Sequence, residues 1–171
     1  MKKIITLLLV MMCVLIVSAQ DKIVLHNGTN AVGKVTELND SYLKFVHEGE
    51  NLVQTYGCNA VDSVILASGR TLKMSDKVVI TSPKDWENVK VVYDKNEVMG
   101  LKSLGKIEKH SNGGWSFHVS LGHFIKKALN KAKKEAALRG APILFIEEQK
   151  DSNMGFFKNA ESTILCNLYT Y

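Results

Sequence analysis

The chain of 171 residues is 46% hydrophobic and carries 22 basic against 17 acidic residues, a formal net charge of +5. This length is enough for one ordinary domain or two small ones. This net positive charge is small, whereas nucleic-acid binders usually concentrate many basic residues in one region. The sequence therefore predicts no nucleic-acid partner.

The first 19 residues have the features of an export signal. Lys2 and Lys3 supply a positive start, residues 4–17 form an apolar run, and small residues end at Ala19, which is the pattern that signal peptidase accepts. We therefore expect cleavage after Ala19 and an exported protein, periplasmic or secreted. The alternative is retention as a membrane anchor, although the run falls short of the ~20 apolar residues that span a bilayer comfortably.

Short strands separated by turn signals are expected over the next part of the chain. About five strands are too few for a sandwich with a good core, whereas closing them into a small all-β barrel removes the exposed edges. We place this barrel at residues 21–80. The apolar segments cover residues 23–25, 32–38, 42–47, 52–56, 64–66 and 72–74, with 78–80 as a last strand.

The stretch IVLHNGTNAVGKVTEL resembles the opening of Sm-like and other SH3-like small barrels, with an apolar strand, an Asn-Gly turn and a Gly-x-Val bend. Gly28 is then expected in a tight turn and Gly33 at a point of strong strand curvature. Sm proteins bind RNA through a later Arg-Gly turn. Here Ser68, Gly69 and Arg70 stand in altered order in an exported chain, so the resemblance does not extend to RNA binding.

A polar connector with Pro83 occupies residues 81–88 and precedes a second domain at residues 89–171. Strands are expected at 89–93 and 104–107, then a long helix, then strands at 142–148 and 161–171. This order predicts a four-stranded sheet with one helix across a face, and an α+β class for the chain.

The predicted helix is amphipathic. Its apolar stripe is rich in alanine, which lets a helix approach a sheet closely, and the lysines fall on the opposite side. Gly140 is placed to end the helix, and Pro142 forbids its continuation. The lysine side is either a solvated face or an anion-binding surface centred on Lys127, Lys131 and Lys134. In the second case the partner would be an anionic membrane surface or envelope polymer.

The segment VKVVYDKNEVMGLKSLGKIEKH, followed by ALNKAKKEAALRGAPILFI and a closing strand that ends in Tyr, resembles a group of small Gram-negative envelope domains. These domains of unknown function share a pattern with the signalling domain of the Rcs envelope-stress lipoprotein. The resemblance implies an envelope location and a non-catalytic role, and it supplies no site residues. Relatives carry a cysteine where this chain has Leu101, so the resemblance gives Cys166 no family partner.

Catalytic and metal-binding motifs are not visible. The histidines at 110, 118 and 123 lack the spacing of a helical ligand pair, and no carboxylate or cysteine completes a set. The sequence predicts no enzyme, no metal and no cofactor, while a hydrolase with a site between the two domains is kept as an alternative. Cys58 and Cys166 either form a disulfide or are two small buried side chains.

Two glycine-containing loops carry aromatic side chains. One loop precedes the helix and holds Trp115 and Phe117, and the other lies between the last two strands and holds Phe156 and Phe157. The expected topology brings both loops to one pole, where the four rings either close off the core or form a patch for a partner. The sequence thus predicts an exported, non-enzymatic interaction module with an envelope protein as its partner.

Overall fold

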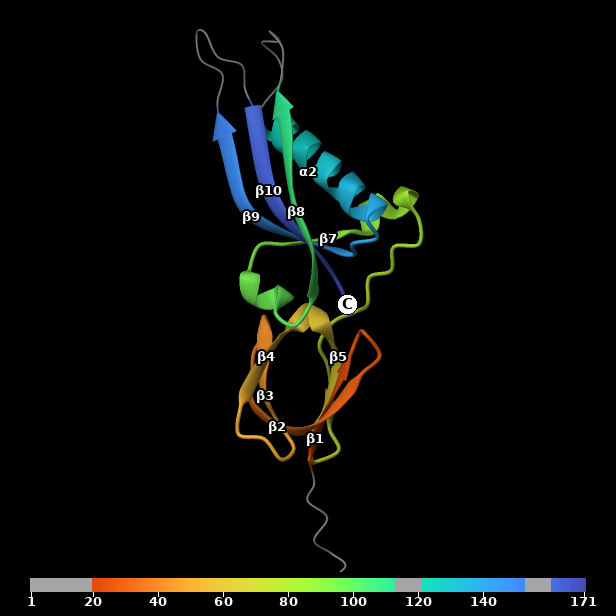
Figure 1. Ribbon diagram of the computed structural model, residues 1–171, viewed down its shortest axis with the longest axis vertical. Coiled ribbons are helices and arrows are strands. Elements are labelled where there is room, and N and C mark those ends of the chain that lie inside the picture. Colours follow the sequence, from red (N-terminus) through yellow and green to blue (C-terminus); the bar gives the residue numbers. More distant parts are fainter. Residues whose placement is uncertain (1–19, 113–120, 153–160) are drawn as a thin grey trace, which may run out of the picture.

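The computed structural model describes residues 20–112, 121–152 and 161–171 (Figure 1). Two β-sheets and one long helix make up this part of the chain, which confirms the α+β class. The first sheet has six strands, and the second has four strands with the helix on one face. Within the described ranges no helix is long and apolar enough to cross a membrane.

The first sheet is antiparallel throughout, in the order β4-β3-β2-β1-β5-β6. Its strands curl around a small core that includes Ile23, Leu43 and Phe45. The pairing leaves β4 and β6 as edges, so a closed barrel remains a prediction. The strands are β1 (Asp21–Leu25), β2 (Asn30–Leu38), β3 (Tyr42–His47), β4 (Val53–Gly57), β5 (Val61–Ile65) and β6 (Thr71–Lys73), and the short 3-10 helix η1 (Cys58–Ala60) precedes β5.

Gly28 has the backbone role that the sequence predicts, and Gly33 lies where two strands approach closely. Gly28 has a φ of 90° in the turn between β1 and β2, a conformation that suits glycine. At Gly33 a Cβ atom would lie 2.1 Å from the carbonyl oxygen of Val46 and 2.9 Å from the ring of Phe45. The missing side chain therefore lets β2 and β3 close over the Phe45 ring.

The connector between the sheets differs from the prediction. Residues 78–80, expected as a last strand, form no strand in the structure. The amide of Val78 donates instead to the side-chain oxygen of Tyr171, and Ile80 packs on the second core. The segment expected as a linker contains the 3-10 helix η2 (Pro83–Asn88), which Ser82 caps and which packs Trp86 against the second core.

The second sheet has four strands, as the sequence predicts, in the order β7-β9-β10-β8. β7 pairs with β9 in parallel, and the other pairs are antiparallel. β8 is longer than the sequence predicts, because it pairs with β10 from Lys102 to Asn112 with one register shift. The elements are β7 (Lys90–Val92), the 3-10 helix η3 (Lys95–Val98), β8 (Lys102–Asn112), α2 (Leu121–Leu138), β9 (Ile143–Ser152) and β10 (Glu161–Thr170).

Helix α2 buries its alanine stripe on the sheet, as predicted. Phe124, Ala128, Ala132 and Ala136 are all buried, and the same core contains the inward side chains of β8, β9 and β10. Gly140 has a φ of 65°. Its amide donates to the carbonyl of Ala137, and the amide of Ala141 donates to that of Ala136. This pair of bonds is a Schellman motif, which ends the helix.

Candidate functional site at the junction of the two sheets

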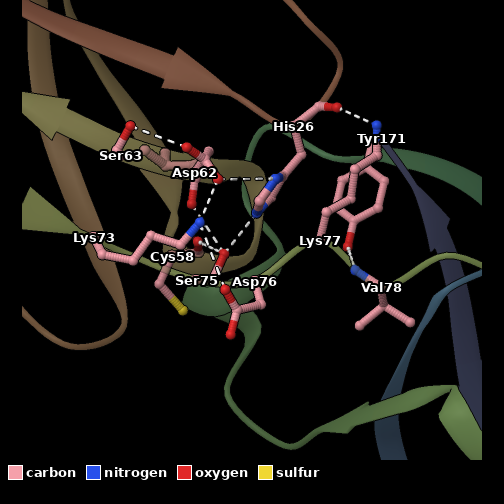
Figure 2. Close-up of polar contacts among 11 residues, drawn as sticks. His26, Cys58, Asp62, Ser63, Lys73, Ser75, Asp76, Lys77, Val78 and Tyr171 are labelled. Carbon is pink, nitrogen blue, oxygen red and sulfur yellow. Dashed lines mark hydrogen bonds and ion pairs between the residues drawn. The ribbon is translucent and has the colours of Figure 1, made fainter.

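A buried histidine lies where the two sheets meet, and polar side chains from several segments surround it. His26 follows β1, Asp62 lies on β5, and Ser75 follows β6. Figure 2 shows these side chains pointing toward one another, with Lys73 beside Asp62. We refer to His26, Asp62, Lys73 and Ser75 as the junction cluster.

Backbone carbonyls fix the hydroxyl of Ser75. It donates to the carbonyl oxygens of Cys58 and Val61, both at 2.9 Å, and its Oγ lies 2.8 Å from Nε2 of His26. A hydroxyl has a single proton, so with that proton directed at the carbonyls the imidazole Nε2 must donate to Oγ. On the neutral ring this leaves Nδ1 without a proton.

The imidazole of His26 is held in its neutral form. The residue is only 5% exposed, and this burial lowers the imidazole pKa below its ordinary value of 6.5. Lys73 and Lys77 lower the pKa further, while the negative charge of Asp62 opposes them. Nδ1 lies 4.0 Å from the nearest Asp62 oxygen, which is too far for a hydrogen bond.

Asp62 is engaged by other partners. Lys73 Nζ lies 2.5 Å from one carboxylate oxygen, and Ser63 donates to the other at 3.0 Å. The hydrogen bonds from Lys73 and then Ser63 lower the pKa of the Asp62 carboxyl. The carboxylate is therefore oriented toward Lys73 and Ser63 rather than toward the imidazole.

The junction cluster has the residue types of a Ser-His-Asp triad without the arrangement that activates a serine. In a triad the imidazole accepts the serine proton, and a carboxylate hydrogen-bonds to the other ring nitrogen. Here the Ser75 proton is directed to backbone carbonyls, and the contact from the imidazole to Asp62 is long. These contacts connect the turn after β1 to the segment after β6.

Tyr171, which follows β10, connects the second sheet to this cluster. Its ring packs edge-on against the imidazole of His26, with centroids 5.1 Å apart, and its hydroxyl accepts the Val78 amide at 2.9 Å. Lys77 Nζ lies 5.4 Å from the ring centroid and donates to the carbonyl of His26. In Figure 2 the Tyr171 ring lies beside His26, and its hydroxyl points to the backbone of Val78.

A second set of contacts joins η1 of the first sheet to η3 of the second. The buried Asn59 donates from its amide to the backbone carbonyl and the carboxylate of Glu97, both at 3.2 Å. It also accepts from Lys90 Nζ at 2.5 Å. Gly57 donates its amide to the Met99 carbonyl at 2.8 Å. The two sheets are thus joined by satisfied polar groups at two places.

The predicted anion-binding residues lie together on α2. Lys127, Lys131 and Lys134 are all exposed and line one shallow groove along the helix. Lys131 Nζ donates to the carbonyl of His110 at 2.8 Å, and Lys134 Nζ lies 5.1 Å from the ring centroid of Trp86. The structure therefore brings these lysines together on one accessible face.

The four predicted aromatic residues, Trp115, Phe117, Phe156 and Phe157, lie outside the described residues. The strand ends that flank them are described. In the register of the second sheet, Glu161 pairs with Asn112 on one side and with Ser152 on the other. The two segments that carry the aromatic residues therefore leave the sheet at adjacent points.

The disulfide considered from the sequence is not formed. Cys58 and Cys166 are both free and buried. Cys58 lies in η1 with its thiol 3.7 Å from the Glu97 carboxylate, while Cys166 lies in the core beneath α2. Burial raises the pKa of each thiol to about 11.

No group of three or more His, Cys, Asp and Glu side chains is placed to hold a metal ion in residues 20–112, 121–152 and 161–171. His110 Nδ1 is 2.9 Å from the hydroxyl of Thr163, and His123 is exposed near the start of α2. His118 lies outside these ranges. The histidines around the helix entry are thus not gathered into a ligand set where they are described.

Sequence reasoning missed the junction cluster. Its members are far apart in the chain and form no spaced motif. His26 stands beside an Asn-Gly sequence, which predicts a backbone turn and indicates nothing about the histidine side chain. No family model, curated protein or solved structure matches this chain at a significant level. Its function is therefore argued from its own geometry.

Proposed function

We propose that this protein is exported to the cell envelope and acts there without catalysis, as a module that binds another envelope protein. In this proposal the leader is removed after Ala19, the first sheet is a small SH3-like barrel, and the second sheet with α2 is a domain of the Rcs-related envelope type. The first described strand begins at Asp21, the second residue after the proposed cleavage point.

One observation carries the binding role. Asn112, Ser152 and Glu161 are neighbours at one end of the second sheet, and both aromatic segments start from there. A glycine-containing loop on a rigid sheet can adapt to a partner while its anchor stays fixed. The proposed partner surface is therefore this end of the sheet, with Trp115, Phe117, Phe156 and Phe157 as its contact residues.

The junction cluster supports a role in assembly. Ser75 and His26 are committed to hydrogen bonds that order the contact between the sheets. The residue types are those of a hydrolase triad, while the contacts of the Ser75 hydroxyl with two backbone carbonyls are typical of a structural role. A rigid junction would hold the two sheets in a defined relation while one of them binds.

Crosslinking on intact cells, followed by mass spectrometry of the captured neighbours, tests the proposal. The double variant Trp115→Ala/Phe157→Ala should lose the crosslinked partner and keep the wild-type unfolding transition. The matched control is Tyr93→Ala, which removes a 67% exposed aromatic ring elsewhere on the second domain and should leave capture unchanged. Equal capture by the double variant would exclude the aromatic segments as the contact surface.

A second candidate function has its own observation. The exposed ammonium groups of Lys127, Lys131 and Lys134 lie on one face of α2, which suits a peripheral binder of an anionic membrane or envelope polymer. Such binding weakens steeply with salt, because at physiological ionic strength dissolved ions largely screen exposed charges that are more than about 8 Å apart. Binding of the purified protein to anionic vesicles or polyanions at low and high salt separates this function from protein recognition.

A further inference from the structure

The lysine face of α2 ends in exposed apolar side chains. The groove lined by Lys127, Lys131 and Lys134 is adjacent to a second groove between α2 and η2, and Lys134 lines both. The second groove is lined by Pro83, Lys84, Trp86, Lys134 and Leu138. We refer to these two grooves together as the α2–η2 face.

Positive charge on this face has few counter-charges in the described structure. Glu135 is the single acid of α2, and its carboxylate is bound by Lys109 at 3.2 Å and Arg139 at 2.8 Å. Asp85 of η2 accepts the backbone amides of Thr81 and Ser82. The exposed side chain of Glu87 in η2 adds one carboxylate at the edge of the α2–η2 face. The lysines of the α2–η2 face thus present a net positive surface.

The apolar end combines side chains that suit a boundary between water and lipid. Leu138 is 65% exposed at the last position of α2. Trp86 packs one side on the core, and the ammonium groups of Lys133 and Lys134 lie 5.9 Å and 5.1 Å from its ring centroid. Lysine stems cover apolar surface while their charges stay in water, and Trp is favoured at membrane interfaces.

We propose that the α2–η2 face docks on an anionic lipid surface. The lysine ammonium groups lie at the lipid phosphates, and Leu138 with the edge of Trp86 enters the headgroup region. This inference rests on the second candidate function and makes it specific, because a soluble polyanion would satisfy the lysines and gain nothing from Leu138. In interfacial helices, basic side chains meet the headgroups and apolar side chains enter the membrane. The apolar stripe of α2 is buried in the core, so here Leu138 and Trp86 supply the apolar contact.

Vesicle co-sedimentation of the chain from Gln20 onward tests the proposal, with phosphatidylglycerol-containing vesicles against pure phosphatidylcholine. Binding is expected to the anionic vesicles alone, and to weaken between about 0.01 M and about 0.15 M salt, as the Debye length falls from about 30 Å to about 8 Å. Lys127→Gln and Lys131→Gln should each weaken the partition coefficient about fivefold. The charge-matched controls, Lys34→Gln and Lys95→Gln, each remove one lysine outside this face and should bind normally.

The apolar contribution is measured with Leu138→Gln, which should weaken binding about threefold to tenfold. Leu52→Gln is the matched control, because Leu52 is 73% exposed in the loop just before β4. Trp86 supplies a direct readout: in a Trp115→Phe background its emission should shift to the blue on binding and be quenched by brominated lipid. This measurement needs no change to Trp86, so it does not depend on whether a Trp86 variant folds.

The outcomes separate the inference from the function on which it rests. Binding that responds to the lysine variants, with normal binding by Leu138→Gln and no quenching of Trp86, would overturn lipid docking through this face and leave anion binding in place. Binding to a soluble polyanion such as polyglutamate without binding to vesicles would do the same. Absence of binding to both vesicles and polyglutamate would remove the anion-binding function as well.

Discussion

The ring of Tyr171 lies edge-on against the imidazole of His26, with centroids 5.1 Å apart, so the end of the last strand meets the turn after the first. Because His26 follows a strand of the first sheet and Tyr171 follows a strand of the second, this contact reports on how the sheets are joined. Its strength depends on the protonation state of His26, which is buried beside Lys73, Lys77, Asp62 and Asp76.

Stability should fall on mild acidification through His26. Its folded-state pKa lies below the unfolded value of 6.5, so its contribution is fully present above pH 6.5 and is lost as the pH falls through the folded-state pKa. Urea unfolding from about pH 7.5 to about pH 5 should show this loss in the wild type, and His26→Gln should show less of it. An equal loss in the variant would contradict a neutral, buried His26.

Removal of the Tyr171 hydroxyl should weaken the same junction. Tyr171→Phe leaves the Val78 amide without its acceptor, which should lower the free energy of unfolding by about 1–2 kcal/mol. Tyr171→Ala also loses the ring contact with His26 and should cost about 2–4 kcal/mol. Hydrogen exchange at the Val78 amide should accelerate in both. The control, Tyr93→Phe, alters a tyrosine that is 67% exposed. An equally large loss of unfolding free energy in this control would argue against a specific hydrogen bond between Tyr171 and Val78.

The local patterns in the sequence predicted the elements well. The spacing of Phe124, Ala128, Ala132 and Ala136 predicted which face of α2 is buried, because helical periodicity is a local property. The turn at Gly28 was also predicted from local chemistry. The prediction of a strand at residues 78–80 was wrong. The Val78 amide donates to the Tyr171 hydroxyl instead of to a strand, and no local pattern in the sequence reveals so distant a partner.

The junction cluster could not be predicted for a related reason. His26, Asp62 and Ser75 come together only after β1, β5 and β6 pair, and the direction of the Ser75 proton depends on two backbone carbonyls of the η1 region. By contrast, the grouping of Lys127, Lys131 and Lys134 was predicted, because one helix supplies all three. Contributions of Trp86 and Leu138 to that face were missed, since they depend on how η2 packs against α2.

A methyl group at Gly57 should disrupt the second contact between the sheets. A Cβ atom there would lie 2.4 Å from the carbonyl carbon and oxygen of Glu97, and backbone atoms of η3 cannot move aside cheaply. Gly57→Ala should cost about 3 kcal/mol or more. Gly69→Ala is the control: it has open space but a φ of 84°, and should cost about 1–2 kcal/mol. Equal losses would show that η1 and η3 are not in close contact.

Both cysteines should be unreactive in the folded protein. Burial raises the thiol pKa of Cys58 and Cys166 to about 11, so about one molecule in a thousand carries the reactive thiolate at about pH 8. For the chain from Gln20 onward, a thiol reagent should label neither residue in the native state, and both after unfolding in denaturant without reductant.

The positive control for this labelling is Leu52→Cys, which places a thiol at a 73% exposed position and should react at once. Labelling of native Cys58 at a rate near that of the control would show that η1 opens away from η3, since its thiol lies against Glu97 there. Failure of both native cysteines to react after unfolding without reductant would show a disulfide. That result would require a different arrangement, because Cys166 lies in the core beneath α2 while Cys58 lies in η1.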